Sequence, residues 1–471
     1  MMANSIFPYT DRFGVLTGLP AEPMADADIL SLLADLATKE DQRWESGKCS
    51  GTTYCGDHEQ YAVEAAAYAR FLHVNTLQRD LCPSMSHMEY EIITMTADLL
   101  HGGAVNELDP NQKVCGVIGA GGTESILNAV LGYRNWAHSR GIEHPQMILP
   151  DTAHPAFLKG AHLFGLELVV VPTDPVSTLV DPADVRAAIT PRTAVIVGSA
   201  GNYAYGTIDP IGALSAIAVE TGVGLHVDGC LGGWILPWGQ RLGYANIPVF
   251  DFRLPGVTSI SADTHKYGYG PKGVSVLLWR DASYRRHHYF VEPDWNGGIY
   301  ASAALLGSRS GGVIAGTWAG MRRLGTPGYV AKAQAIFDTA LSMQEHVRSH
   351  PELTIMGDPT FCFAFRSDAF DVYHVNDAMK ANGWRFNGLQ HPAALHFCVT
   401  GPQTQAGFVD TWAAELAAGV AYSREHRADQ PRSGSMYGGA GLSGPAAETA
   451  RREAIGGIGL FVDLITDGPP C

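Results

Sequence analysis

Lys266 has the surroundings in this sequence that most favour covalent chemistry. It lies in the segment SADTHKYGYGPKG (261–273), a turn rich in glycine and tyrosine that precedes a predicted strand, Val274 to Trp279. An amine must lose its proton to form an imine, and a partly desolvated lysine flanked by His265 loses it more easily than a solvated one. An isolated lysine in a turn is usually a surface residue, so the interpretation depends on its neighbours.

A glycine-rich turn offers a phosphate-binding site. The segment GVIGAGGTES (116–125) runs from a short predicted strand into a helix, where free backbone N–H groups can hold a phosphate. Glu124 stands where the third glycine of a dinucleotide-binding GxGxxG loop would lie, so that pattern fails. We predict a monophosphate site in which Gly121 and Gly122 allow close approach and Thr123 donates its hydroxyl. An ordinary strand-to-helix turn is the alternative.

An imidazole and a carboxylate lie on another predicted strand. His226 and Asp228 are two residues apart and therefore point to the same face of that strand. They could be metal ligands, but no third ligand follows at a supporting spacing. We favour Asp228 as the anion that keeps the pyridine ring of pyridoxal 5′-phosphate (PLP) protonated, so that the ring withdraws electrons. An aspartate bonded to backbone amides is an equally common alternative.

Alternating strands and helices must position these residues. Between about residues 115 and 330, β-rich runs alternate with helical patterns, which predicts a mostly parallel sheet flanked by helices. We expect an N-terminal helical arm (1–65), a large domain (66–330) and a smaller C-terminal α+β domain (331–471). Strands are predicted near 170 and at 193–200, 224–229, 275–279, 361–366 and 394–400, and helices at 29–44, 61–72, 124–140, 211–221 and 329–350.

Composition excludes several other classes of protein. The chain has 471 residues, 46% of them hydrophobic, and can bury a large core. Its apolar runs fall short of the roughly 20 residues that span a bilayer, and its start has no export signal, so we expect a cytoplasmic protein without an integral membrane segment. A net charge of −15 disfavours nucleic-acid binding. Eight cysteines without a CxxC pair indicate reduced thiols and no metal site.

Motifs along nearly the whole chain resemble the group II PLP-dependent decarboxylase superfamily, and among its branches the sphingosine-1-phosphate lyases are the most similar. The resemblance implies PLP-dependent transferase fold type I, like aspartate aminotransferase, with a seven-stranded central sheet. It also implies a homodimer with active sites at the subunit interface. The motifs are GKCSGTTYCGD (47–57), NTLQRD (75–80), GGTES (121–125), HPAFLKG (154–160), HVDGCLGG (226–233), SADTHKYGYGPKG (261–273), GGIYASAALLGSRSGG (297–312), WRFNGLQHPAALHFCVT (384–400) and MYGGA (436–440).

The resemblance also assigns roles to individual residues. It implies that Lys266 carries PLP as a Schiff base, that Asp228 pairs with the pyridinium and that His154 stacks over the ring. The other expected cofactor contacts are Gly121, Gly122, Thr123, Ser199, His226 and His265, with Gly307 and Ser308 reaching the partner's cofactor. The expected substrate contacts are Asn75, Gln78, Lys272, Tyr300 and Arg309, with Tyr54 entering the partner's substrate channel.

The implied lyase reaction removes the proton of a C3 hydroxyl and breaks the C2–C3 bond of a phosphorylated β-hydroxyamine, giving an aldehyde and phosphoethanolamine. Tyr205, Tyr203, His265 or the substrate phosphate would be the base. Lys272 favours this reaction, because a cation six residues after Lys266 resembles the phosphate site of the lyases. Gln78 replaces a histidine of those lyases, so decarboxylation of an amino acid or aminophosphonate is the alternative. A non-catalytic PLP-binding protein is the least favoured interpretation.

Overall fold

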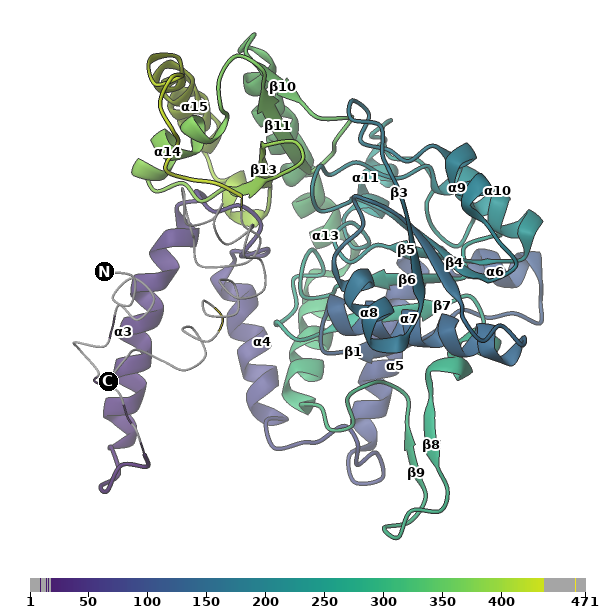
Figure 1. Cartoon of the computed structure of the whole chain (residues 1–471). Helices are drawn as coiled ribbons and strands as arrows, with labels where there is room; N and C mark the ends of the chain where they lie inside the picture. The colour runs from purple at the N-terminus through teal and green to yellow at the C-terminus, as the bar shows by residue number, and fades with distance from the viewer. Residues whose placement is uncertain (1–8, 10–13, 15, 17, 436–461, 463–471) are drawn as a thin grey trace.

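A seven-stranded sheet lies at the centre of the molecule (Figure 1). The structure, a computed structural model, describes residues 18–435 and positions 9, 14, 16 and 462, so the motif at 436–440 lies outside the described residues. The strands are β1 (Cys115–Gly119), β2 (Gln146–Pro150), β3 (Glu167–Val171), β4 (Thr193–Ser199), β5 (Gly224–Asp228), β6 (Ser259–Ala262) and β7 (Ser275–Trp279). Their order is β1-β7-β6-β5-β4-β2-β3. Since β7 is antiparallel to both neighbours and the other pairs are parallel, the predicted mostly parallel sheet is confirmed.

The central strands are buried on both faces, as their continuous apolar runs require. Every residue of β4 is buried, and its side chains alternate between two apolar cores. Val195 and Val197 belong to the core on one face, and Ile196 belongs to the core on the other. Helices α7 (Gly122–Ser139) and α8 (Ala156–Phe164) supply the first core, whereas α10 (Ile211–Thr221) and α5 (Pro83–Leu99) supply the second.

The C-terminal part begins on a long helix and ends in a smaller sheet. Helix α13 (Gly311–Arg348) contains one non-helical residue, Gly325. The domain boundary predicted between residues 330 and 331 lies inside this helix and stays a prediction. A four-stranded sheet follows in the order β10-β11-β13-β12, with all pairs antiparallel. Its elements are β10 (Leu353–Ile355), β11 (Cys362–Ser367), α14 (Tyr373–Ala381), β12 (Asn387–Leu389), β13 (Ala394–Cys398) and α15 (Phe408–Glu425).

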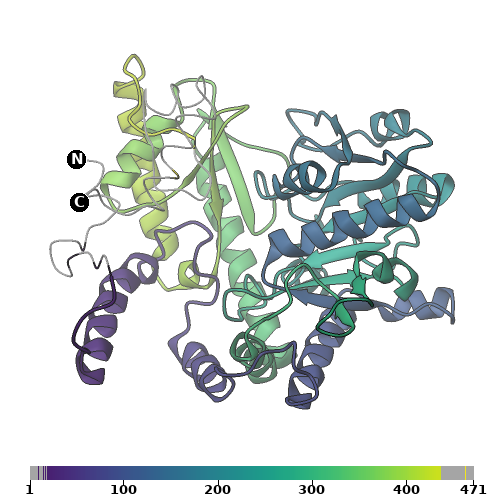
Figure 2. The ribbon, with the colours of Figure 1, turned by 60° about the horizontal axis from the view of Figure 1, so that its bottom comes forward.

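Two elements extend away from the central sheet. Helix α3 (Asp26–Glu45) has no buried residue and lies apart from the sheet in both views (Figures 1 and 2). Its neighbour α4 (His58–Arg70) packs on α13 instead. A hairpin of β8 (Phe290–Glu292) and β9 (Tyr300–Ser302) projects beyond the large sheet (Figure 1). The shorter helices are α6 (Gly103–Leu108), α9 (Pro182–Ala188), α11 (Leu236–Leu242) and α12 (Ala282–Arg285). Across the described residues, no helix is both long and apolar enough to traverse a bilayer.

Candidate active site

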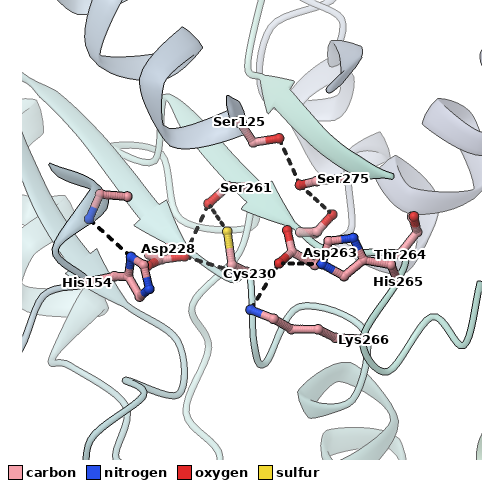
Figure 3. A network of polar contacts seen from close by, with 12 residues as sticks. Ser125, His154, Asp228, Cys230, Ser261, Asp263, Thr264, His265, Lys266 and Ser275 are labelled. Atoms are coloured by element: carbon pink, nitrogen blue, oxygen red, sulfur yellow. Dashed lines mark hydrogen bonds and ion pairs between the residues drawn. The ribbon is translucent and has the colours of Figure 1, made fainter. Parts of the chain in front are cut away.

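Lys266 opens into a cavity of about 550 Å³ between the ends of several strands. The turn between β6 and β7 carries the lysine together with Asp263 and His265 (Figure 3), and the start of α7 packs against this turn and also lines the cavity. The cavity therefore brings together residues from five separate segments of the chain. Its lining residues are Ala120, Gly121, Gly122, Thr123, Glu124, Ile126, Leu127, His154, Cys230, Asp263, His265, Lys266, Leu305 and Leu306.

Lys266 is paired with a buried carboxylate on its own turn. Its Nζ lies 3.0 Å from Oδ2 of Asp263, whose side chain is 1% exposed. Burial opposes the charge on Lys266, but the Asp263 carboxylate outweighs it and raises the pKa of the ammonium above its ordinary value. Burial also opposes the charge on Asp263, and the charge of Lys266 nevertheless lowers the pKa of that carboxyl. The pair is therefore ionised at neutral pH.

Asp228 lies at the carboxyl end of β5, where Cys230 N–H and Ser261 Oγ both donate to its Oδ1, at 3.0 and 3.3 Å. In the described part of the chain its Oδ2 receives no hydrogen bond and is available to a ring nitrogen. His226 lies deeper in the sheet and contacts Ser261 at 3.2 Å and Ser259 at 2.7 Å. Burial lowers the pKa of His226 to about 4, so its imidazole is neutral. Neither His226 nor Asp228 is among the described residues that line the cavity, although Cys230, which donates to Asp228, does line it.

The predicted phosphate turn lies at the N-terminus of α7. Gly121 has φ +150°, a conformation that side chains rarely adopt, and a Cβ on Gly122 would lie 2.6 Å from Asp263 Oδ2. No side chain caps the first turn of α7, and Gly121, Gly122 and Thr123 all face the cavity. The turn thus presents free N–H groups and a hydroxyl to an anion.

Two histidines border the cavity. His154 accepts a hydrogen bond from Ala156 N–H at Nδ1, 3.1 Å away, and burial lowers the pKa of its imidazole. A neutral ring at the edge of the cavity is suited to stacking. His265 accepts from Gly273 N–H at Nδ1, 3.3 Å away, and its Nε2 lies 3.5 Å from Asp263. These contacts indicate the Nε2–H tautomer of His265.

A second cavity of about 480 Å³ adjoins the first and shares His265 with it. Lys272 donates to the carbonyl oxygen of His265 at 3.1 Å, and its Nζ lies 4.6 Å from the ring centre of Tyr54. Desolvation by surrounding atoms and then the charge of Lys266 lower the pKa of Lys272 to about 8, although its side chain reaches solvent. Tyr54 thus lies beside Lys272 of its own chain. The prediction that it enters the partner's channel stays untested.

A third group of predicted residues lies just outside the Lys266 cavity, where the chain continues from Leu306. Asn75 donates to Ser308 Oγ at 2.9 Å and accepts from Arg309 N–H at 3.4 Å. The guanidinium of Arg309 pairs with Glu89 at 2.6 Å. Gly307 and Arg309 line a separate cavity of about 450 Å³, and Tyr300 lies close to Gly307. Gln78, three residues after Asn75 in the sequence, is exposed. None of these six predicted residues lines the Lys266 cavity of the described chain.

Three further predicted residues lie behind the cavity wall. Ser199 ends β4, where its N–H donates to Asp209 at 2.7 Å. Tyr203 stacks on His396 with ring centres 4.5 Å apart. Burial and then the charge of Asp151 raise the pKa of Tyr205. None of the three lines the Lys266 cavity in the part of the chain that is described.

Asp263 and Cys230 are cavity residues that the sequence alone did not reveal. Cys230 is 7% exposed, and its Sγ lies 3.2 Å from Ser261 Oγ. The position of Cys230 two residues after Asp228 was the available signal for it. The signal for Asp263 was its position three residues before Lys266. This signal is weaker, because an aspartate in a turn is usually solvated.

The arrangement fits PLP at each of its functional ends. Lys266 provides an amine for the aldehyde, Asp228 provides an anion for the ring nitrogen, and His154 provides a flat, neutral side chain for the face of the ring. The glycine turn at the start of α7 supplies donors for the phosphate. The donor set therefore matches the cofactor, and PLP, when bound, supplies a ring that accepts the electrons of a breaking bond.

Comparisons with known proteins agree with this chemistry. The conserved domain of pyridoxal-dependent decarboxylases matches residues 69–366. Sphingosine-1-phosphate lyase 1 of Rattus norvegicus is 40% identical over 401 residues, 85% of this chain and 69% of that protein. The lyase of Dictyostelium discoideum is 38% identical over 95% of this chain and 82% of its own length.

A solved structure supports the same relationship. The sphingosine-1-phosphate lyase of Burkholderia pseudomallei K96243 is 62% identical, with a TM-score of 0.88, over 90% of this chain and 96% of that one. The predicted fold type I and the predicted PLP cofactor are confirmed. The chain belongs to the pyridoxal-dependent decarboxylase family and, within it, to the PLP-dependent sphingosine-1-phosphate lyases.

Proposed function

We propose that this protein cleaves the C2–C3 bond of sphingosine 1-phosphate, or of a closely similar phosphorylated β-hydroxyamine, to an aldehyde and phosphoethanolamine. The position of Lys272 carries the proposal, because it places a cation in the second cavity, beside the His265 that both cavities share, and several aromatic side chains line that second cavity. With its pKa at about 8, Lys272 is mostly charged at pH 7 and can bind a phosphate head group. The 62% identity to a bacterial lyase supports the same substrate.

The residues in and beside the cavity would divide the work of such a reaction. Lys266 would hold the cofactor aldehyde, and its Nζ would have to lose a proton before it can do so. Asp228 would keep a proton on the ring nitrogen, with Cys230 N–H and Ser261 holding its Oδ1 in place. His154 would contact the ring. The turn at 121–123 would hold the phosphate end, and the contacts of the substrate's own groups would select the bond that breaks.

The base for the C3 hydroxyl must have a free lone pair. His265 uses Nδ1 to accept from Gly273 N–H and directs Nε2 toward Asp263, so neither nitrogen is free. We infer that Tyr203, Tyr205 or the substrate phosphate takes the proton; because neither tyrosine lines the Lys266 cavity of the described chain, a tyrosine would have to move toward the bound substrate to do so. Replacing each tyrosine by phenylalanine distinguishes them, since loss of the base lowers kcat far more than it raises KM.

We also infer a cytoplasmic homodimer. Exposed apolar side chains support the dimer, since monomers rarely expose such clusters. On α3, Leu30 is 66% and Leu33 is 55% exposed, and on the hairpin Trp295 is 59% and Ile299 is 80% exposed. In a homodimer, the segment 307–309 would face the partner's cofactor, and Asn75 and Tyr300, which lie close to this segment, would contact substrate. Sedimentation of the purified holoenzyme tests the dimer.

The experiment that tests the function is an aldehyde assay. The purified holoenzyme is incubated with sphingosine 1-phosphate, and both products are measured by mass spectrometry. We expect a long-chain aldehyde and phosphoethanolamine in equal amounts. Absence of any aldehyde, together with carbon dioxide release from an amino-acid panel, would replace the proposal by decarboxylation.

A further inference from the structure

A buried carboxylate lies between the reactive lysine and the phosphate turn. Asp263 is 2% exposed as a residue, its Oδ2 lies 3.0 Å from Lys266 Nζ, and its Oδ1 has no hydrogen-bond partner in the described chain. Gly122 packs so closely that a Cβ there would lie 2.6 Å from Oδ2. An anion held this tightly against an ammonium keeps a proton on it, because breaking a buried pair leaves an uncompensated charge.

No other group near Lys266 replaces this carboxylate. Asp228 makes its bonds to Cys230 and Ser261, whereas Asp263 is foremost among the charges that raise the pKa of Lys266. Lys272 is a like charge that opposes the ammonium. The titratable and charged groups near Lys266, on its own turn and on the segments packed against it, are Tyr54, His154, Cys230, Asp263, His265, Lys272 and Cys398.

The charge on Lys266 matters for the first step, in which its amine binds the aldehyde. The nitrogen bonds the aldehyde carbon, the carbonyl oxygen leaves as water, and starting from the ammonium one proton is released for each neutral C=N bond formed. Only the neutral amine has the lone pair for this attack. A carboxylate that holds the ammonium proton therefore delays the step until the pH rises.

We propose that Asp263 is a positioning residue that holds the Nζ proton of Lys266 in the cofactor-free protein and so sets the pH at which this lysine binds PLP. The inference rests on the assignment of Lys266 as the PLP lysine. As long as the pH stays below the pKa of Lys266, the neutral fraction of this lysine in the wild-type protein increases tenfold for each unit by which the pH rises. The rate of PLP capture should therefore rise about tenfold per unit between pH 6 and 8.

Asp263→Asn tests the role directly. Cofactor-free protein is mixed with PLP, quenched with borohydride at intervals, and the pyridoxyl label on the Lys266 peptide is counted from pH 6 to 9. Without its counter-ion the partly buried lysine becomes easier to deprotonate, so capture at pH 7 should be at least about tenfold faster and its pH dependence should flatten. Asp251→Asn removes an equally buried, ion-paired carboxylate outside the cavity and should leave the profile unchanged.

Two results would overturn the inference. One is an Asp263→Asn profile that coincides with the wild-type profile. The other is a wild-type rate that does not change from pH 6 to 8, which needs no variant and so holds even if Asp263→Asn fails to fold. Both concern Asp263 alone. A wild-type label on a lysine other than Lys266 would instead reject the assignment on which the proposed function depends.

Discussion

Replacing Lys272 by glutamine should weaken binding of the substrate phosphate without dismantling the cavity. Glutamine can still donate to the carbonyl oxygen of His265, which Lys272 reaches at 3.1 Å, but it carries no charge. A hydrogen bond to a charged group contributes roughly 1.5–3 kcal/mol. Because this side chain reaches solvent, screening favours the lower half of that range. We expect kcat/KM for sphingosine 1-phosphate to fall roughly 10- to 50-fold, on the basis of about 1.4 kcal/mol per tenfold change.

The assay is steady-state aldehyde release over a range of substrate concentrations. The loss should appear mainly in KM, because the head group does not change charge during C2–C3 cleavage and its contact stabilises ground state and transition state alike. Lys380→Gln, on the exposed end of α14, is the matched control and should leave both constants unchanged. A Lys272→Gln enzyme with wild-type KM, or one that loses only kcat, would refute the role given to this lysine.

Three other predictions follow from the same geometry. Asp228→Asn keeps an acceptor for Cys230 N–H but removes the anion at the ring nitrogen, so kcat should fall at least about tenfold, measured by aldehyde release. Since the charged form of Lys272 is lost as pH rises through about 8, KM for the phosphorylated substrate should increase above pH 8, and a flat KM from pH 7 to 9 would contradict this. Burial raises the pKa of Glu64 from about 4.5 to about 7, so the folded state loses about 3 kcal/mol of stability as pH rises between these values. Glu64→Gln should remove most of that loss in urea unfolding at pH 5 and 8, whereas the exposed Glu59→Gln should not.

Strongly periodic elements were predictable from the sequence, and glycine-rich ones were not. The helix at 211–221 and the strand at 275–279 have the predicted bounds. Helix α13 consists of two helical segments joined at the non-helical Gly325, and the predicted start at Tyr329 lies close to the start of the second segment, whereas the first segment, which begins at Gly311, was missed. Gly312 and Gly320 lower the helical signal there, yet a Cβ at either position would meet Tyr68 or Glu64 of α4 within 3 Å. Packing against α4 therefore outweighs the low helix propensity of glycine.

The candidate site was predictable where neighbours in sequence are also neighbours in space. The turn around Lys266 and the turn at 121–123 both line the cavity. The resemblance implied that His226 contacts the cofactor; its side chain contacts Ser259 and Ser261 and does not line the cavity, and the cofactor contact stays a prediction. The burial of Asp263 could not be predicted, since it comes from Gly122, which is distant in the sequence. Likewise, no local pattern pairs Asn75 with Ser308.

The most direct test of this account is to identify the lysine that binds PLP. The purified holoenzyme is reduced with borohydride, digested, and its pyridoxyl peptide sequenced by mass spectrometry. The structure predicts one label, on Lys266, and none on Lys272 or on Lys159 of α8. A label on either of those lysines, or no label on any peptide, would contradict the active site described above.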